Sequence, residues 1–340
     1  MCGILAVFGL EGHPENYEKN FLENLDCMEH RGQDSTGFYW GENFILGHLR
    51  LGFVGGTSGT QPLSSYDSSI VCIANGEIYN YKSIWKQLDK IDPTINKQRR
   101  SESDCETFIT CYQAFGPNFL QKVDLVGMFA FILVDMKKQK VIIGRDFGGK
   151  VPLHFCKDKN GESWFASEKK GLMNQVEHMD EIFDFPIGKY YLIDRIQQTK
   201  QVKTIPNNPL QHSFAPIKNW STEEILTKFC IAVERIIPEK IPFAVLLDGS
   251  IYAELLFHAI QGRVNDKKRI FPIILHGDFF YSDDDIRKLQ KEYGCDLHAI
   301  TISPSRILED IEDIMYAIES ADPAKIFEGS TIYYGNFFID

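Results

Sequence analysis

The residues best suited to chemistry lie at the start of the chain, which reads Met1-Cys2-Gly3. Cysteine is small enough for the initiator methionine to be removed, which would leave Cys2 with a free α-amine. Such an amine has a pKa of about 7.7–8.0 and a thiol one of about 8.5, so near neutrality the amine can accept the thiol proton, directly or through a water. Cys2 would then be a nucleophile with its own base, although most cysteines near a terminus have no such role. A retained Met1 would instead place that amine in a peptide bond.

Three polar segments farther along the chain add groups that could serve this nucleophile. Residues 30–37 read HRGQDSTG, residues 47–51 read GHLRL and residues 75–80 read NGEIYN. Taken singly, they are typical of a turn, an alternating strand face and a hairpin loop. The second segment sets Arg50 inside a β-type run.

In this order, behind an N-terminal cysteine, these segments resemble the class II glutamine amidotransferases, whose glutaminase domain has an N-terminal-nucleophile fold. Later stretches are similar to the asparagine synthetase branch: NGEIYNY at 75–81, SDCE at 103–106, GMFAFILVD at 127–135, RD at 145–146 with PL at 152–153, and FASE at 165–168. The resemblance runs through nearly the whole first half of the chain and continues more faintly to its end.

The resemblance implies how glutamine would be held for attack by Cys2. Arg50 would bind the α-carboxylate, because a guanidinium can donate two parallel hydrogen bonds to it. Glu77 and Asp104 would supply the negative charge that the α-ammonium group requires. The expected substrate is therefore glutamine, which is hydrolysed to glutamate and ammonia.

The resemblance also implies an oxyanion hole, formed by the side chain of Asn75 and the backbone N–H of Gly76. Attack on an amide puts negative charge on its oxygen, and loss of one donor to that oxygen typically costs about 10²–10³ in rate. We expect Arg31 and Asp34 to brace this site and not to react.

The second half of the chain contains a strand, a small-residue turn and a helical pattern at residues 243–256, FAVLLDGSIYAELL. Many α/β proteins bind phosphate at such a turn, because free backbone N–H groups at a helix start attract anions. In asparagine synthetases, the resemblance implies, this domain activates aspartate with ATP and magnesium, and ammonia reaches it through an internal tunnel. The activating loop of the family reads Ser-Gly-Gly-hydrophobic-Asp-Ser.

The matching positions here, Asp248 to Ala253, read DGSIYA. Gly249 and Ser250 retain a glycine and a hydroxyl, but Asp248 brings a carboxylate to the place of phosphate oxygens. Tyr252 replaces an acid with a bulky phenol, and Ala253 has no hydroxyl. At an effective dielectric of ~20, like charges about 4 Å apart repel by ~4 kcal/mol, roughly a thousandfold in affinity. We therefore expect a degenerate ATP loop, with ATP and magnesium as cofactors only if the synthetase domain is active.

The family has a further glycine- and acid-rich loop beyond the helices that match residues 309–318 and 331–339, and this chain stops at Asp340, about where that loop would begin. The sequence thus predicts a truncated synthetase-like domain. Its partners would be a companion synthetase subunit or further copies of the same chain.

The candidate residues of the first half require a domain of short strands to position them. Up to about residue 195, β-type runs are split by turns, and helical patterns occur only near 17–28 and 103–115. Many strands, few helices and no regular β-α alternation predict an α+β domain of antiparallel sheets with helices on their faces. The resemblance makes this an αββα sandwich, which we assign to residues 1–196.

A polar, proline-bearing stretch at 197–219 predicts a linker, and the pattern changes beyond it. Residues 220–340 alternate predicted strands with predicted helices, which implies right-handed β-α-β units and a parallel sheet. This domain resembles the ATP-pyrophosphatase fold. The predicted elements are helices at 222–237, 250–261 and 283–293, strands at 242–247, 270–275 and 296–302, and a helix begun by Ser303-Pro304.

Composition narrows the class of protein. A net charge of −11 argues against nucleic acid as the main partner, since binding of phosphate backbones relies on clustered Lys and Arg. The eight cysteines form no C-x-x-C pair, and the N-terminal apolar run at 4–10 has no basic leader and is too short to span a bilayer. We therefore predict a cytoplasmic protein without membrane partners, disulfides or a structural metal site.

Three functional hypotheses remain at this point. The first is a glutamine-hydrolysing amidotransferase of asparagine synthetase type, with ATP chemistry lost from a remnant synthetase domain. The second is a working glutamine-hydrolysing asparagine synthetase, or a subunit of one, that uses ATP, magnesium and aspartate. The third is a non-catalytic pseudoenzyme that serves as a binding or structural module.

Overall fold

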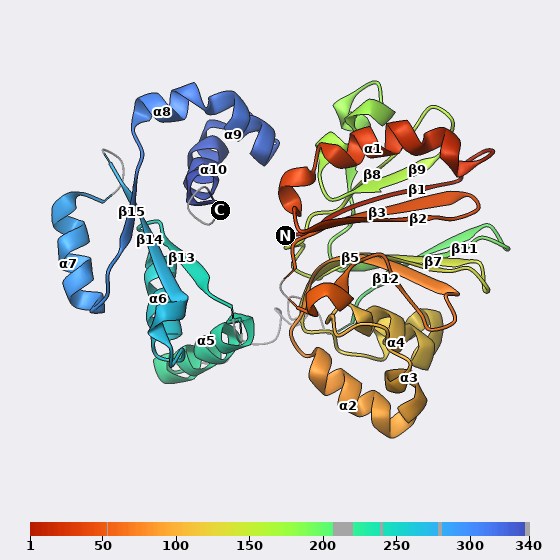
Figure 1. Cartoon of the computed structure of the whole chain (residues 1–340), viewed down its shortest axis with the longest axis horizontal. Helices are drawn as coiled ribbons and strands as arrows, with labels where there is room; N and C mark the ends of the chain where they lie inside the picture. The colour runs from red at the N-terminus through yellow and green to blue at the C-terminus, as the bar shows by residue number, and fades with distance from the viewer. Residues whose placement is uncertain (53, 207–219, 239–240, 278–280, 337–340) are drawn as a thin grey trace. The chain divides into compact units, whose positions relative to one another are not determined.

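A computed structural model of the chain describes residues 1–52, 54–206, 220–238, 241–277 and 281–336. The chain divides into two compact units, Met1–Ile217 and Lys218–Asp340 (Figure 1). Among the described residues, no hydrophobic cluster draws members from both units. Each unit therefore has hydrophobic cores of its own.

The first unit contains two six-stranded sheets, in which every described strand pair is antiparallel. The first sheet has the order β10-β8-β9-β1-β3-β2, with bounds β1 Gly3–Phe8, β2 Ser35–Trp40, β3 Phe44–Arg50, β8 His154–Lys157, β9 Ser163–Ala166 and β10 Phe183–Asp184. The second has the order β12-β11-β7-β6-β5-β4, with bounds β4 Leu63–Ser64, β5 Ile70–Ile78, β6 Gly127–Asp135, β7 Lys140–Arg145, β11 Lys189–Asp194 and β12 Thr199–Thr204.

The two sheets face each other, and helices cover their outer faces (Figure 1). Helix α1 (Glu18–Asp26) lies on the first sheet, and the second carries α2 (Tyr81–Ile91), α3 (Pro93–Lys97) and α4 (Glu106–Phe115). This is the predicted αββα sandwich. The predicted helices near 17–28 and 103–115 correspond to α1 and α4.

Two helices of this unit were not predicted. Helix α2 buries Ile84, Trp85 and Leu88 and exposes its lysines, a spacing that is typical of an amphipathic helix and that the prediction from sequence overlooked. Helix α3 has a readable start, because the Asp92 side chain accepts from the N–H of Thr94 at 2.9 Å and Pro93 occupies the first turn.

The predicted linker at 197–219 requires a correction at its start. Its first residues include β12, which pairs with β11 and extends the second sheet. The segment TKQVKT is polar and largely exposed because it is an edge strand, so it lacks the hydrophobic alternation that marks a buried strand. Residues 207–219 lie outside the described part of the chain.

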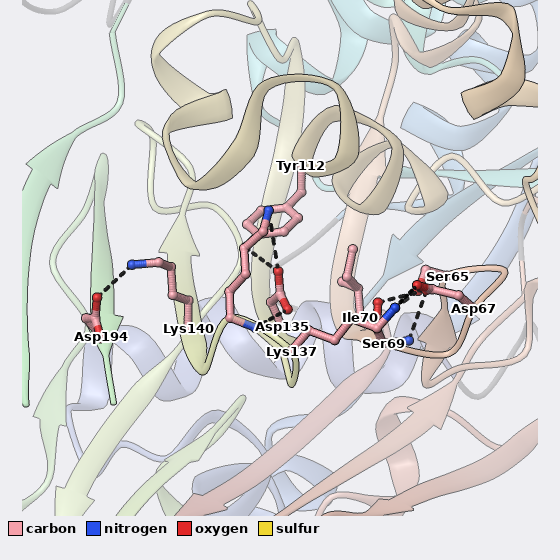
Figure 2. Close-up of polar contacts among 10 residues, drawn as sticks. Ser65, Asp67, Ser69, Ile70, Tyr112, Asp135, Lys137, Lys140 and Asp194 are labelled. Carbon is pink, nitrogen blue, oxygen red and sulfur yellow. Dashed lines mark hydrogen bonds and ion pairs between the residues drawn. The ribbon is translucent and has the colours of Figure 1, made fainter. Parts of the chain in front are cut away.

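Polar contacts fasten one end of the second sheet (Figure 2). The hydroxyl of Tyr112, on α4, donates to a carboxylate oxygen of Asp135 at the end of β6, at 2.7 Å. Nearby, Lys140 of β7 donates to Asp194 of β11 at 2.7 Å, and Lys137 donates to Asp67. These contacts lie at the end where β6 pairs with the first residue of β5, Ile70.

The second unit contains a parallel sheet, as predicted, of order β13-β14-β15. Its strands are β13 Phe243–Leu247, β14 Ile270–His276 and β15 His298–Thr301, and its helices are α5 Thr222–Ile236, α6 Ile251–Gln261, α7 Asp283–Tyr293, α8 Pro304–Glu309, α9 Ile311–Ile318 and α10 Pro323–Asn336. Capping boxes at Ser221 and Ser282 begin α5 and α7. In the described part of the chain, no helix is long and apolar enough to cross a membrane.

Candidate active site

The candidate residues of the first unit gather at one end of the layer between its two sheets. The hydrophobic core of this layer contains alternate residues of three strands: Ile4 and Ala6 of β1, Phe44 and Leu46 of β3, and Val71 and Ile73 of β5. Because side chains alternate along a strand, Cys2, Arg50 and Asn75 face the same layer. The pairing of Gly3 with Leu49 then sets Cys2 beside Arg50.

Cys2 lies against the backbone of Leu51. Its sulfur is 3.4 Å from the Leu51 N–H nitrogen, which donates to it, and 3.5 Å from the Leu51 carbonyl oxygen. Burial raises the pKa of the Cys2 thiol, opposed by the Leu51 N–H, the nearby α-amine and the charges of Arg50 and Arg31. Burial and Arg31 also lower the pKa of the Met1 α-amine. The surroundings of the chain start therefore favour an uncharged amine beside an uncharged thiol.

A buried carboxylate organises the charges behind Cys2. Glu168 contacts Arg31 Nη1 at 2.6 Å, Lys170 Nζ at 2.9 Å and His30 Nε2 at 3.2 Å. Burial alone would raise the pKa of Glu168, but these three neighbours bring it down to about 2. Arg31 in turn donates from Nε to the carbonyl oxygen of Cys2 at 2.9 Å, so the network holds the nucleophile's backbone.

Arg50 ends β3 and is well placed to receive an anion. It is 8% exposed, and its Nη2 donates to the carbonyl oxygen of Val54 at 3.2 Å. Within the described residues, no carboxylate forms an ion pair with it. Gly52 and Gly59 make room for its guanidinium, since a Cβ at Gly59 would lie 2.7 Å from Nη2. Asp34 accepts from the N–H of Gly52 at 2.6 Å and fixes the same loop.

Asn75 is a buried amide with free hydrogen-bonding capacity. The residue is 1% exposed, yet neither its Nδ2 nor its Oδ1 has a hydrogen-bond partner among the described residues. Leaving such a group unpaired costs about 1–3 kcal/mol, so an unpaired buried amide calls for an explanation. A reacting group that accepts from Nδ2 would supply one.

The neighbouring Gly76 exposes its backbone N–H to the same place. Its strand partner Phe129 directs its own N–H and C=O to Asp146, at 3.2 and 2.8 Å, and therefore away from β5. The pair is thus a non-hydrogen-bonded one, which turns the N–H of Gly76 away from β6. Gly76 has φ +142°, and a Cβ there would lie 2.1 Å from the carbonyl oxygen of Met128, so only glycine fits.

Two acidic side chains close the site. Glu77, on β5, is partly exposed, and burial together with the charge of Asp104 raises its pKa to about 7. Asp104 is 4% exposed and accepts from the N–H of Ile78 at 2.7 Å. Burial also raises the pKa of Asp104, against its hydrogen bonds to backbone N–H groups. Two neighbouring carboxyl groups whose pKa values are raised by burial suit the binding of an ammonium group.

The six predicted residues of the first unit thus come from β3, β5, the chain start and the segment before α4. Sequence reasoning gave no role to His48 or Gln61, which both bond to Ala74, directly before Asn75. His48 lies in the segment GHLRL at residues 47–51, two residues before Arg50. This position could have indicated a role for His48 at the site.

Comparison with known proteins identifies the family of the chain. Residues 1–212 match the glutamine amidotransferase domain, which is well over half of the chain. The chain belongs to the glutamine amidotransferase domain family. Along 96–98% of its length the chain is also similar to asparagine synthetases, which supports the asparagine synthetase type.

The chain is 30% identical over 351 residues to glutamine-hydrolyzing asparagine synthetase B of Escherichia coli (strain K12), covering 98% of this chain and 60% of that protein. It is 33% identical over 341 residues to glutamine-hydrolyzing asparagine synthetase 2 of Arabidopsis thaliana, covering 96% and 55%. The chain therefore spans little more than half the length of these relatives. Among solved structures, the glutamine phosphoribosylpyrophosphate amidotransferase from B. subtilis is similar at a TM-score of 0.49 and 14% identity, over 95% of this chain and 94% of that one.

Two N–H groups at the turn before α6 in the second unit have acceptors within the chain itself. The carboxylate of Asp248 accepts from the N–H of Ser250 at 2.9 Å, and the Ser250 hydroxyl accepts from the N–H of Ala253 at 3.2 Å. Gly249 has φ +87° and lies close to the phenol of Tyr281.

More negative charge surrounds this turn. Burial, followed by the charges of Glu254, Asp248 and Asp285, raises the pKa of Tyr281. Tyr252 lies at the first turn of α6, and its side chain is 79% exposed and does not pack against the loop. Among the described residues, no group of three or more His, Cys, Asp or Glu side chains could hold a metal ion.

Proposed function

We propose that the first unit hydrolyses glutamine to glutamate and ammonia through Cys2, and that ATP-dependent activation of aspartate is lost from the second unit. The observation that carries the first part is the buried, unpaired amide of Asn75 beside the outward N–H of Gly76. In the described part of the chain neither donor has a protein acceptor, and both lie near the face to which Cys2 belongs. Such an arrangement suits an oxygen that gains negative charge during attack.

In the proposed reaction, the α-carboxylate of glutamine binds Arg50 and its α-ammonium group binds Glu77 and Asp104. The Cys2 thiol gives its proton to the α-amine that removal of Met1 would free, and the sulfur attacks the side-chain amide carbon. Collapse of the tetrahedral intermediate breaks the C–N bond, and the amine's proton leaves with ammonia. Water then attacks the thioester, releasing glutamate and restoring the thiol.

The test is release of glutamate from glutamine by the purified chain, with Cys2→Ala as the control and the intact mass showing whether Met1 is present. Release that disappears in Cys2→Ala supports the proposal. A chain that lacks Met1 and still releases no glutamate would overturn it and favour the pseudoenzyme hypothesis.

The second part of the proposal rests on the turn at Asp248. The N–H groups of Ser250 and Ala253 already have protein acceptors, and the acceptor of the first is an anion. A phosphate would have to displace that carboxylate and lie beside it, at a cost of ~4 kcal/mol for charges about 4 Å apart.

A working asparagine synthetase is the second candidate, because the likeness to these enzymes includes the second unit. The two candidates differ in nucleotide binding. Calorimetric titration of the chain with ATP and magnesium should show no binding at millimolar concentration, whereas magnesium-dependent binding and asparagine formation would establish the second candidate.

A further inference from the structure

Asn75 has no hydrogen bond that would set the position of its side chain within the described residues, so its backbone must do so. The peptide plane that joins Ala74 to Asn75 contains the Ala74 carbonyl and the Asn75 N and Cα atoms. Whatever fixes that carbonyl therefore also fixes the Asn75 N and Cα atoms, from which the side chain leaves the strand.

The Ala74 carbonyl is held by two side chains from outside its sheet ladder. His48 Nε2 lies 3.1 Å from it, across the layer between the two sheets, and Gln61 Nε2 donates to it at 2.9 Å. Gln61 Oε1 also accepts from the N–H of Ala74 at 2.7 Å. The pairing of β4 with β5 ends at Cys72, so the amide of Gln61 replaces a strand residue there.

Both side chains are suited to hold one fixed position. His48 is fully buried and Gln61 is 6% exposed. A carbonyl can only accept, so the hydrogen of the neutral imidazole must be on Nε2. Burial, with the charge of Arg50, lowers the pKa of His48 to about 3, so this tautomer persists over the working pH range.

We propose that His48 and Gln61 are positioning residues. By hydrogen bonding to the backbone of Ala74, they orient the Asn75 amide and the following Gly76 N–H. The inference rests on the proposed hydrolysis of glutamine. Neither residue touches the reacting atoms. They should therefore affect kcat, through the oxyanion, and leave the KM for glutamine nearly unchanged, because Arg50, Glu77 and Asp104 hold the other end of the substrate.

The experiment compares glutamate release by His48→Phe, His48→Gln and Gln61→Leu in the full-length chain. Phenylalanine keeps a ring without a donor, and glutamine restores an N–H at a similar reach. We expect His48→Phe and Gln61→Leu to lower kcat about 10- to 100-fold, less than the 10²–10³ for loss of a donor. KM should change less than twofold, and His48→Gln should recover most of kcat.

The matched control is Tyr112→Phe, which removes a buried hydrogen bond from the far end of the same sheet (Figure 2). Asp135, its partner, is six residues along β6 from Phe129, roughly 20 Å from Gly76 at ~3.4 Å per residue. The control should lose stability and keep kcat. Equal kcat losses in Tyr112→Phe and His48→Phe would reduce the effect to general destabilisation and overturn the inference, as would full activity of both His48→Phe and Gln61→Leu.

A second readout separates this inference from the proposed function. The ¹⁵N resonance of the Asn75 side-chain amide should shift in His48→Phe and Gln61→Leu, return toward the wild-type position in His48→Gln, and stay in place in Tyr112→Phe. This measurement needs no turnover, so an inactive wild-type chain would refute glutamine hydrolysis and still decide the positioning role. An unmoved Asn75 resonance in both variants would refute that role.

Discussion

At the scale of single residues, Asn75 combines complete burial with two unpartnered polar atoms, an arrangement that lowers stability. Natural proteins retain such costs where a site needs them. Its neighbours show the same tendency, since burial disfavours the charged forms of both Glu77 and Asp104, and the charge of Asp104 adds to this effect at Glu77. The residues of the proposed site thus oppose the stability of the fold that carries them.

Asn75→Ala should separate activity from stability. We expect kcat to fall about 10²–10³-fold because an oxyanion donor is lost, with little change in KM. The thermal midpoint should stay the same or rise, because the change removes an unsatisfied buried amide. Initial rates and calorimetry check this. A midpoint that falls along with activity would indicate that Asn75 has a structural partner.

Glu77 should make glutamine binding depend on pH. With a pKa of about 7, its carboxyl is neutral below that pH and anionic above it, so the KM for glutamine should fall as pH rises through 7. In Glu77→Gln, KM should be higher and lose this dependence, as steady-state kinetics between pH 6 and 8.5 would reveal.

The same shift has the opposite sign for stability. The folded state holds the Glu77 proton up to about pH 7, whereas the unfolded chain releases it near pH 4.3, so this group's contribution falls as pH rises between these values. Glu77→Gln should remove that fall. A steeper loss of stability with pH in the variant would contradict the sign.

At the scale of elements, the parallel sheet of the second unit and its helices were readable from their caps and alternation. The capping boxes at Ser221 and Ser282 mark real helix starts because their side chains satisfy N–H groups that no preceding turn can bond. The edge strand β12 was missed because it is polar and lacks apolar alternation, whereas α2 was missed although Ile84, Trp85 and Leu88 have helical spacing.

For the candidate site, the sequence named residues that the structure brings together, but not what aligns them. Cys2, Arg50 and Asn75 could be named from motifs near strand ends. The hydrogen bonds from His48 and Gln61 to Ala74 join residues that are 26 and 13 positions apart in the sequence. They depend on how the two sheets stack, which local sequence patterns do not encode.

The caps of the second unit can be tested at Ser282, whose hydroxyl accepts from the N–H of Asp285 at 3.3 Å at the start of α7. Ser282→Ala should lower the unfolding free energy of this unit by about 1 kcal/mol, and Ser282→Thr should retain most of it. Denaturant titration would measure both. Glutamate release should be unaffected in either variant, since the residue belongs to the other unit.

At the scale of the whole molecule, the described chain is two units whose hydrophobic clusters share no residue. All six residues of the proposed glutamine site lie in the first unit. The proposed site is thus built from residues of one unit, and that unit has hydrophobic cores of its own.

A fragment of residues 1–217 should therefore fold and release glutamate from glutamine with kcat within a few-fold of the full chain. Circular dichroism and glutamate assays of the two proteins make the comparison. A folded but inactive fragment would show that the second unit completes the glutamine site.

The carboxylate of Asp248 has a thermodynamic consequence. A protein that binds a ligand only when folded gains RT ln(1 + [L]/Kd) of stability, so its persistence tracks the ligand's concentration. In the second unit, an acceptor built into the chain already bonds the N–H of Ser250 at the start of α6. If the second unit has lost ATP binding, as proposed, its folding should be uncoupled from the supply of nucleotide, and changes in nucleotide concentration should leave its abundance unaltered.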